Sequence, residues 1–361
     1  MLTEEKIFAK ADDFFAKMQD SIVNAKRSIY LETYIFEQDG LGKKILSHLV
    51  DAAKRKVRVQ VLIDGVGSSD WTFSDAEVFR KQAIQFNFFH PLIWQRQPYK
   101  IWQSFTFQRI ARGFSKINHR NHRKICIVDN KELFICSMNI SDRHLESVKQ
   151  EKAWKDIGVC IQGKGVERFL SSSQETWSYA NHFFGQRWLR MRRQKNKAHK
   201  DILNLIRNAK ETVWITNPYF VPDFKLTKAL FRAASTGIDV KILVPQKSDI
   251  LGLKFAMQGF YSALLKRGCK IFEYTPSILH AKILIIDNWV SVGSTNLDYR
   301  SLFYNLEADI SLTDPQNIQL MKKQFIDDLA VSKQILLKEW NNRPLYQRLL
   351  QKFFLIFRGI F

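Results

Sequence analysis

Residues 280–296 read HAKILIIDNWVSVGSTN, and residues 122–139 read HRKICIVDNKELFICSMN. Each stretch has a histidine, a lysine two residues later and an aspartate five residues after the lysine, and it ends in Ser-x-Asn. The apolar run inside each stretch is bounded by turn residues, which indicates a buried strand. A single copy is compatible with an edge strand that carries incidental polar residues. Two copies with the same downstream Ser-x-Asn indicate a duplicated functional element.

The repeat extends beyond these motifs. Residues 24–36, NAKRSIYLETYIF, align without gaps on residues 208–220, NAKETVWITNPYF, and each stretch is expected to be a helix end followed by a strand. A helical run and a second strand follow, VRVQVLID ending at Asp64 and IDVKILVP ending at Pro245. Each half therefore predicts β-α-β followed later by the motif strand. Parallel strands joined by crossover helices are expected.

The composition is that of an ordinary globular protein. The chain has 361 residues, of which 45% are hydrophobic and 25% charged, enough for two domains of typical size. No stretch reaches the roughly 18 consecutive apolar residues of a spanning helix, and the start MLTEEKIFAKADDFF lacks the pattern of a signal peptide. We therefore expect a protein that is made and kept inside the cell.

The cysteines show no Cys-x-x-Cys pair and lie mostly in apolar runs. Reduced, buried thiols are expected in such positions, with neither disulfides nor structural zinc. The four residues are Cys126, Cys136, Cys160 and Cys269.

The net charge of +21, with a pI of about 9.8, predicts attraction to a polyanion. Nucleic acid and an anionic membrane surface both satisfy this condition, and charge does not choose between them. Residues 86–114, within a long segment from 68 to 116, interleave aromatic side chains with Arg and Lys. Such a segment suits lipid or nucleic-acid bases, or it packs its aromatics on its own domain.

Two further segments are strongly basic. Residues 187–200, RWLRMRRQKNKAHK, predict a solvated basic helix and linker between a domain at 1–186 and a second domain at 201–335. The amphipathic tail at 336–361 ends in RPLYQRLLQKFFLIFRGIF, which starts at Arg343 and is too short to span a bilayer. It has the profile of an interfacial anchor, with a docked C-terminal core helix as the alternative.

The repeated residue types suit phosphoryl chemistry. A histidine acts as nucleophile or proton carrier near neutral pH, and two facing copies can divide these tasks. Lysines, hydroxyls and amides beside them would stabilise the negative charge of a phosphodiester without a metal ion. The side chains expected to meet across a two-fold interface are His122, Lys124, Ser137 and Asn139 with His280, Lys282, Ser294 and Asn296.

Metal ligation by His119 and His122 is the alternative to this chemistry, but no acidic ligand cluster accompanies them. His119 is expected to be a hydrogen-bonding neighbour, and no metal or cofactor is predicted.

Each active imidazole also needs an orienting acceptor on its other nitrogen. Asp156 and Glu307 stand just before a following strand, at comparable places in the two halves, and we assign them this role. The motif aspartates Asp129 and Asp287 are grouped with the catalytic residues, with structural ion pairs as the alternative.

The doubled motif resembles the H-x-K-x4-D signatures of the phospholipase D superfamily, over roughly residues 20 to 330. Four stretches are similar to bacterial cardiolipin synthases, especially the shorter type without N-terminal membrane spans. They are GSTNLDYRSLFYNLEADISL, HRNHRKICIVD, YLETYIFEQDGLGKKIL and AWKDIGVCIQG. The resemblance implies an α/β fold of two phospholipase D-like α/β/α repeats, with mixed sheets packed face to face about a pseudo-two-fold axis.

The resemblance also implies a reaction. His122 attacks the phosphate of one phosphatidylglycerol while His280 protonates the departing glycerol, leaving a phosphatidyl-histidine. A second phosphatidylglycerol, deprotonated by His280, then attacks to release cardiolipin. The order of these two roles is carried over from the family and could be reversed here. The implied partner is anionic phospholipid at the cytoplasmic face of the bacterial membrane, where the protein would be peripheral; nucleic acid is not expected.

One residue departs from the family pattern, since Cys136 stands where glycine is usual. Its Cβ could crowd the phosphate and change the donor geometry of the first half. Alternatives with the same two histidines are a phospholipase D hydrolase, a phosphatidylserine synthase and a nuclease or other phosphodiesterase; a silent binding protein is the non-enzymatic alternative. The apolar basic tail and the 28 phenylalanines favour a lipid surface over nucleic acid.

Overall fold

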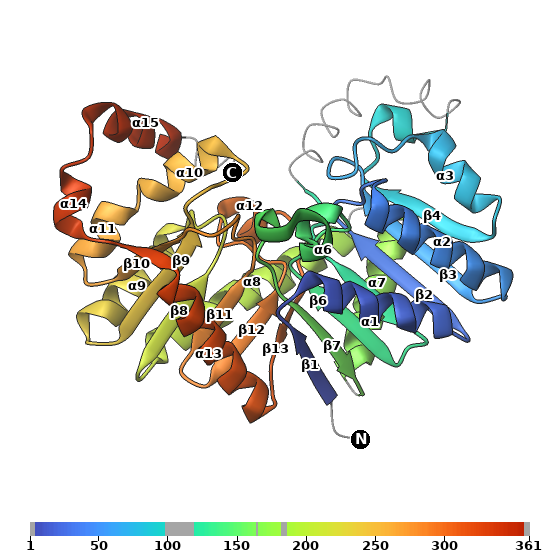
Figure 1. Cartoon of the computed structure of the whole chain (residues 1–361), viewed down its shortest axis with the longest axis horizontal. Coiled ribbons are helices and arrows are strands. Elements are labelled where there is room, and N and C mark those ends of the chain that lie inside the picture. The colour runs from blue at the N-terminus through green and yellow to red at the C-terminus, as the bar shows by residue number, and fades with distance from the viewer. Residues whose placement is uncertain (1–3, 98–118, 164, 182–185, 357–361) are drawn as a thin grey trace. The chain divides into compact units, whose positions relative to one another are not determined.

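The computed structural model describes residues 4–97, 119–163, 165–181 and 186–356, without the side chains of 181–196, and it divides into two compact units. Figure 1 shows the course of the chain from the first unit to the second. Each unit takes one short segment from the opposite half of the sequence. The first unit comprises Met1–Lys149, Ile157–Leu189 and Tyr304–Ala308. The second comprises Gln150–Asp156, Arg190–Phe303 and Asp309–Phe361.

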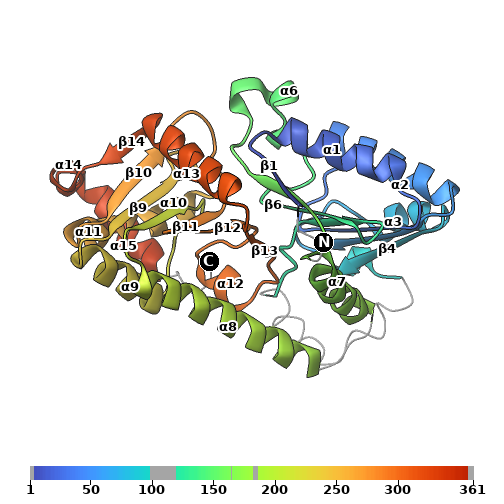
Figure 2. The same ribbon diagram turned by 90° about the horizontal axis from the view of Figure 1, so that it is seen from below.

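The first unit is built on a seven-stranded mixed sheet in the order β1-β7-β6-β5-β2-β3-β4. Strands β2, β3 and β4 run parallel, and the remaining pairs are antiparallel. The strands are β1 Glu4–Phe8, β2 Ser28–Thr33, β3 Arg58–Asp64, β4 Ile84–Phe89, β5 Ile125–Val128, β6 Glu132–Cys136 and β7 Gly158–Gln162. Helices α1 (Ala11–Asn24) and α2 (Gly40–Lys54) cover one face, and α7 (Gly165–Asn181) covers the other (Figure 2). Helix α3 (Phe73–Arg80) packs beside β4.

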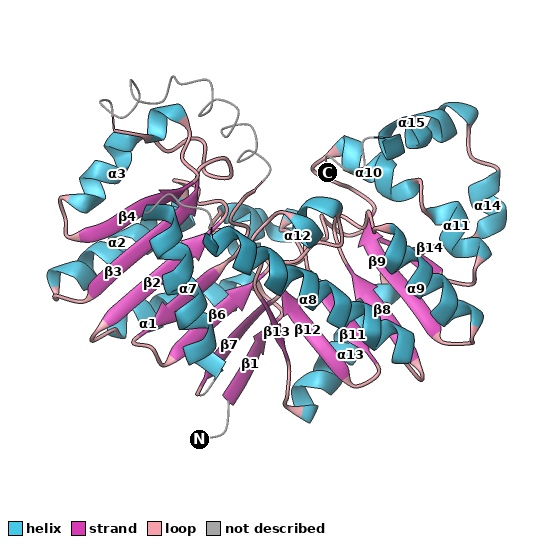
Figure 3. Cartoon of the chain, turned by 180° about the vertical axis from the view of Figure 1, so that it is seen from behind, coloured by secondary structure: helices cyan, strands magenta, loops and turns pink. Residues whose placement is uncertain are grey.

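The second unit repeats this plan in the order β13-β12-β11-β8-β9-β10-β14. Strands β8, β9 and β10 are parallel, and β11 is antiparallel to β8. The strands are β8 Thr212–Thr216, β9 Asp239–Pro245, β10 Lys270–Tyr274, β11 Ile283–Ile286, β12 Trp289–Gly293, β13 Asp309–Ser311 and β14 Ser332–Ile335. The main helices are α8 Gln186–Asn208, α9 Phe224–Ser235, α10 Leu251–Gln258, α11 Tyr261–Lys266, α12 Tyr299–Phe303 and α13 Pro315–Ala330 (Figure 3).

The prediction of two α/β repeats with mixed sheets is therefore confirmed, but parallel pairing holds only for β2, β3 and β4 in the first unit and for β8, β9 and β10 in the second. The motif strands β5 and β11 run antiparallel to β2 and β8. In the first unit the chain re-enters the sheet at the end where β4 finishes. The Arg120 guanidinium, five residues before β5, shows this by its contacts with the carbonyls of Phe89 and His90. A strand that starts at that end must run opposite to its parallel neighbours.

The hydrophobic core follows from the periodicity of these elements. Helix α1 buries Phe14, Met18 and Ile22, which recur at helical spacing on one face. Strand β3, which lies between β2 and β4, buries both of its faces, as expected of a parallel strand covered by helices on both sides. All four cysteines are buried, as predicted, and burial raises the pKa of Cys160 and Cys269 to about 12.

Most of the aromatic segment predicted at 86–114 lies outside the described residues, because residues 98–118 are not described. The last five residues of the tail, 357–361, also lie outside them. The basic stretch at 187–200 falls inside helix α8. Within the described chain, no helix is both long enough and apolar enough to cross a bilayer.

The amphipathic tail forms helices α14 (Leu337–Asn341) and α15 (Leu345–Ile356), and α15 packs along α10. Phe354 stacks on Phe255 with ring centroids 5.8 Å apart. Gln351, which is 1% exposed, donates to Gln258 at 3.4 Å and accepts from Arg343 at 2.9 Å. The tail is thus docked on the second unit through one face of α15.

The opposite face of α15 is apolar and exposed. Its side chains retain between 36% and 77% of their accessible surface: Leu345, Tyr346, Leu349, Leu350, Phe353 and Ile356. We call these six residues the α15 face.

Candidate active site

His122 lies at the leading end of motif strand β5, against a carboxylate that arrives from the far end of the sequence. Its Nδ1 is 2.9 Å from Oε2 of Glu307, and both side chains are largely buried. The backbone N–H of His122 donates to the carbonyl of Leu306 at 2.9 Å. The segment Tyr304–Ala308 therefore reaches His122 as a short parallel bridge.

His280 has the same arrangement in the second unit. Its Nδ1 is 3.0 Å from Oδ1 of Asp156, and its backbone N–H donates to the carbonyl of Lys155 at 2.8 Å. In both units, the orienting carboxylate directly follows the residue that accepts the histidine N–H. A carboxylate on Nδ1 holds the tautomer whose Nε2 lone pair can attack or accept a proton.

The motif lysines are buried beside the histidines, each 3% exposed. Lys124 Nζ donates to the carbonyl of His122 at 2.8 Å, and Lys282 Nζ donates to the carbonyl of His280 at 2.5 Å. Lys282 Nζ also lies 3.1 Å from Nε2 of His280. Since an ammonium group only donates, this contact requires a lone pair on Nε2 and agrees with a proton on Nδ1 facing Asp156.

The serine and the asparagines of the two Ser-x-Asn sequences have different surroundings. Ser137 Oγ donates to the carbonyl of Ile157 at 3.2 Å and accepts from its N–H at 3.1 Å, so this hydroxyl ties β6 to β7. Asn139 and Asn296 are each 3% exposed, and the buried Oδ1 of each has no hydrogen-bond partner in the described part of the chain. A buried amide oxygen without a protein partner has hydrogen-bonding capacity left for a bound ligand or water.

Comparison with known proteins agrees with this geometry. The family model for the cardiolipin synthase, PLD-like domain matches residues 18–166 and 202–329. Cardiolipin synthase 2 of Bacillus anthracis is 30% identical over 97% of this chain and 69% of its own length. The cardiolipin synthase of Clostridium perfringens is 30% identical over 95% of this chain and 74% of its own.

The chain belongs to the cardiolipin synthase family of phospholipase D-like proteins. It is accordingly a cardiolipin synthase-like phosphatidyltransferase. Among solved structures, the phosphatidylserine synthase of Haemophilus influenzae has a similar fold, with a TM-score of 0.71 at 15% identity over 99% of this chain and 95% of that chain.

The contacts of Asp129 and Asp287 favour the structural alternative over the catalytic role that was predicted for them. Asp129 closes the β5–β6 turn and accepts the backbone N–H groups of Lys26, Arg27 and Ser28 at 2.7–2.9 Å. Asp287 does the same for residues 210, 211 and 212. Both residues have a positive φ at the tip of a hairpin, so their carboxylates turn away from the motif lysines and bind the start of β2 or β8. Such contacts are those of residues that stabilise the fold.

Three aromatic residues beside the histidines were missed from the sequence. The Tyr34 ring lies 4.9 Å from that of His122, and Lys124 Nζ lies 5.4 Å from its centroid. Trp154 lies 5.3 Å from His280, and Tyr219 lies 6.5 Å from it. The available signal was that Tyr34 directly follows β2 and that Tyr219 lies three residues beyond the end of β8. His119 was expected to be a hydrogen-bonding neighbour of the site. Its Nδ1 lies 3.4 Å from the carbonyl oxygen of Tyr304, three residues before Glu307.

Replacing Asp129 by Ala should reduce stability and leave chemistry intact. Three backbone N–H groups lose their acceptor, which costs about 2–4 kcal/mol of unfolding free energy, whereas turnover per folded molecule should stay within about threefold of wild type. Denaturant unfolding and activity at a permissive temperature measure the two effects, with exposed Asp13→Ala as the control. A loss of activity above about a hundredfold in folded Asp129→Ala would return Asp129 to the catalytic set.

The same interaction predicts an acid dependence. Burial raises the pKa of Asp129, but hydrogen bonds from Ser28, Lys26 and Arg27 outweigh it, so the net pKa is lowered. The stabilisation is therefore present above the ordinary carboxyl pKa of about 4 and disappears as pH falls through the lower folded value. The difference in unfolding free energy between wild type and Asp129→Ala should accordingly shrink in acid. A difference that stays constant down to pH about 2 would contradict this account.

Proposed function

We propose that this protein joins two phosphatidylglycerol molecules into cardiolipin and glycerol through a phosphatidyl-histidine intermediate. The observation that carries the proposal is the repeated pairing of a buried histidine Nδ1 with a carboxylate and of the same histidine with a buried lysine. Paired Nδ1 atoms leave two Nε2 atoms for nucleophilic attack and proton transfer, and the lysines supply positive charge for phosphate oxygens. The proposal requires both histidines to act on one phosphorus atom and needs no cofactor.

In the first step, Nε2 of His122 attacks phosphorus and the bond from phosphorus to the glycerol oxygen breaks. For this step the Lys282 ammonium turns from Nε2 of His280 to a phosphate oxygen, and His280 takes up a proton on Nε2. It gives that proton to the leaving oxygen, and Asp156 stabilises the imidazolium before transfer. The amides of Asn139 and Asn296 are assigned to the phosphate, since each can turn its Nδ2 toward a phosphate oxygen.

In the second step, neutral His280 removes the proton from a hydroxyl of the second phosphatidylglycerol. The resulting oxygen nucleophile attacks phosphorus, the bond to Nε2 of His122 breaks, and cardiolipin leaves. Both histidines return to their starting protonation states, so the cycle is balanced in protons and phosphatidyl groups.

Histidine variants test these roles. Purified protein with labelled phosphatidylglycerol vesicles should form cardiolipin and glycerol, and His122→Ala or His280→Ala should lower turnover at least about a thousandfold. Chelators should have no effect, and His48→Ala, on α2, is the control. Label trapped on the protein in an alkaline denaturing quench, which preserves the P–N bond, should be absent in His122→Ala but should accumulate slowly in His280→Ala; the opposite pattern would exchange the two roles. Phosphatidic acid as sole product would identify a hydrolase instead.

We further propose that the enzyme is peripheral and docks on anionic lipid at the cytoplasmic face of the membrane through the α15 face. The face presents six exposed apolar side chains, and Lys352 beside it is exposed. A basic protein of net charge +21 with an exposed amphipathic helix suits a negatively charged bilayer surface.

Replacing Leu349 and Phe353 by Glu should weaken co-sedimentation with phosphatidylglycerol vesicles at least about tenfold, because two apolar contacts are lost and two negative charges approach an anionic surface. Both side chains are more than half exposed, so folding should be unaffected. The matched control is Leu320→Glu with Ile326→Glu on α13, which exposes apolar side chains in the same unit. Equal binding by the α15 variant and wild type would exclude this face as the docking surface.

A further inference from the structure

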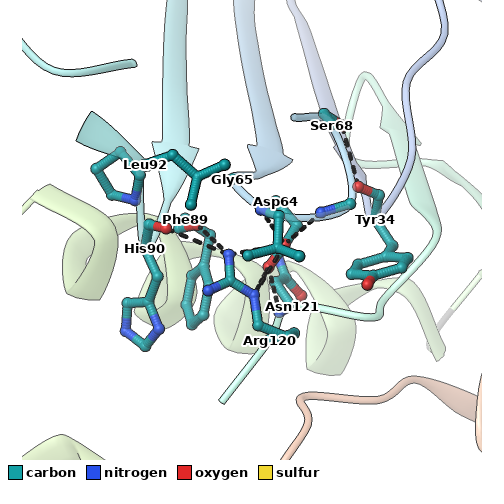
Figure 4. A network of polar contacts seen from close by, with 12 residues as sticks. Tyr34, Asp64, Gly65, Ser68, Phe89, His90, Leu92, Arg120 and Asn121 are labelled. Atoms are coloured by element: carbon teal, nitrogen blue, oxygen red, sulfur yellow. Dashed lines mark hydrogen bonds and ion pairs between the residues drawn. The ribbon is translucent and has the colours of Figure 1, made fainter. Parts of the chain in front are cut away.

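A buried ion pair joins Asp64 to Arg120, two residues before His122 in the sequence (Figure 4). Asp64, the last residue of β3, is fully buried and accepts from the Arg120 guanidinium at 2.8, 3.0 and 3.1 Å. Its carboxylate also accepts the backbone N–H groups of Val66, Gly67 and Asn121 at 2.8–2.9 Å. This carboxylate therefore joins the end of β3 to the two residues that precede His122.

The same two residues are tied to the neighbouring strands. The Arg120 guanidinium donates to the carbonyls of Phe89 and His90 at 3.3 and 3.2 Å, just beyond β4. Asn121 Nδ2 donates at 2.7 Å to Glu32 on β2, which is also fully buried. Residues 120 and 121 are consequently fixed to the ends of three parallel strands.

These residues also hold the segment that carries Glu307. The backbone N–H of Leu306 donates to the carbonyl of Arg120 at 2.8 Å, and Asn121 forms a parallel bridge with Leu306. The next residues along the two segments are His122 and Glu307, whose side chains are hydrogen-bonded. Any movement of Arg120 or Asn121 would therefore shift both the imidazole and its carboxylate.

The second repeat provides an internal comparison. Pro245 ends β9 where Asp64 ends β3, and Ile278 and Leu279 precede His280 where Arg120 and Asn121 precede His122. The backbone bridge to the opposite segment forms all the same, since the N–H of Lys155 donates to the Ile278 carbonyl at 2.8 Å. The fold can therefore build this bridge from apolar residues.

A buried ion pair loses much of its Coulomb attraction to desolvation, and apolar replacements of similar volume are often no less stable. Since the second unit lacks this pair at the equivalent positions, fold stability does not explain it. A bidentate Arg–carboxylate pair does impose a narrow geometry on the groups that it joins.

We propose that Asp64 and Arg120 are positioning residues that fix the orientation of the His122–Glu307 pair for attack on phosphorus. The inference deepens the proposed function and rests on it for the kinetic effect. A displacement of about 1 Å at a reacting group can cost about a hundredfold in rate. The second histidine, which exchanges protons, does not have to meet phosphorus along a fixed line and lacks this ion pair.

The double variant Asp64→Asn with Arg120→Met tests the proposal. It removes both charges together, so that no buried charge is left unpaired, and it retains similar side-chain volumes. With phosphatidylglycerol vesicles, kcat should fall about 10- to 100-fold while KM stays within about threefold, because ground-state binding is not disturbed. Ile22→Ala, a cavity variant in the core of the same unit, is the control for a general loss of stability.

Hydrogen–deuterium exchange provides a readout that does not depend on the reaction. Peptides covering 119–124 and 304–308 should exchange at least about tenfold faster in the double variant, while peptides of α1 and β2 stay at the level of wild type. If either kcat per folded molecule or exchange in these two peptides matches the Ile22→Ala control, the positioning role is wrong.

If the double variant does not fold, Arg120→Lys replaces it, since lysine keeps the charge but not the bidentate geometry. The same local exchange increase with at least about a fivefold fall in kcat supports positioning, and wild-type kcat and exchange overturn it. Failure of the proposed function can be told apart from failure of the positioning role. In the first case the wild-type protein forms no cardiolipin, and the exchange measurement still decides whether the ion pair holds these two segments.

Discussion

The hydrogen bond between each histidine Nδ1 and its carboxylate is the interaction on which the site depends. An imidazole without a fixed proton on Nδ1 has no defined nucleophilic nitrogen, and here the fixing group comes from the opposite half of the chain in both units. Glu307 is 185 residues from His122, and Asp156 is 124 residues from His280. Neither half of the sequence therefore contains a complete histidine–carboxylate pair, and the chemistry requires both halves to be folded together. Duplication alone does not produce this arrangement; an exchange of two short segments does.

The two histidine sites share a backbone plan but differ in chemistry. Glu307 serves the first and the shorter Asp156 the second, and Lys282 Nζ approaches Nε2 of its own histidine at 3.1 Å. The two residues before His122 belong to a charged network built on Asp64, whereas apolar residues precede His280. In the second unit an ion pair of 3.4 Å joins Lys155, the residue before Asp156, to Asp328. Two histidines that perform the same task would not need such different surroundings. The differences suit the proposed mechanism, in which one histidine forms a covalent bond and the other moves protons.

Sequence reasoning was sufficient wherever the signal was local or repeated. The apolar runs of β5 and β11, the β-α-β start of each half and the buried thiols could be predicted because burial leaves a pattern in the residues themselves. The direction of the motif strands could not, since it depends on which end of the sheet the chain re-enters. The contacts of Asp129 and Asp287 could not be predicted either, because they depend on a hairpin with positive φ at which each carboxylate meets the backbone of a neighbouring strand. Asp64 and Arg120, 56 residues apart, form a pair without any periodic trace in the sequence.

The C-terminal tail shows why two sequence interpretations that appear exclusive can both describe one helix. Apolar residues that recur every 3.6 positions show that a helix has an apolar side. They do not show whether all of that side is buried or whether part of it stays exposed. In α15 one face is held on the second unit by a polar relay, in which Gln351 connects Arg343 to Gln258 and Gln258 donates to buried Glu273 on β10. Because buried amides demand partners, this relay fixes the rotation of the helix about its axis. The remaining apolar side chains are therefore held outward, and a docked helix presents a rigid apolar face that loses little conformational entropy when it meets a surface.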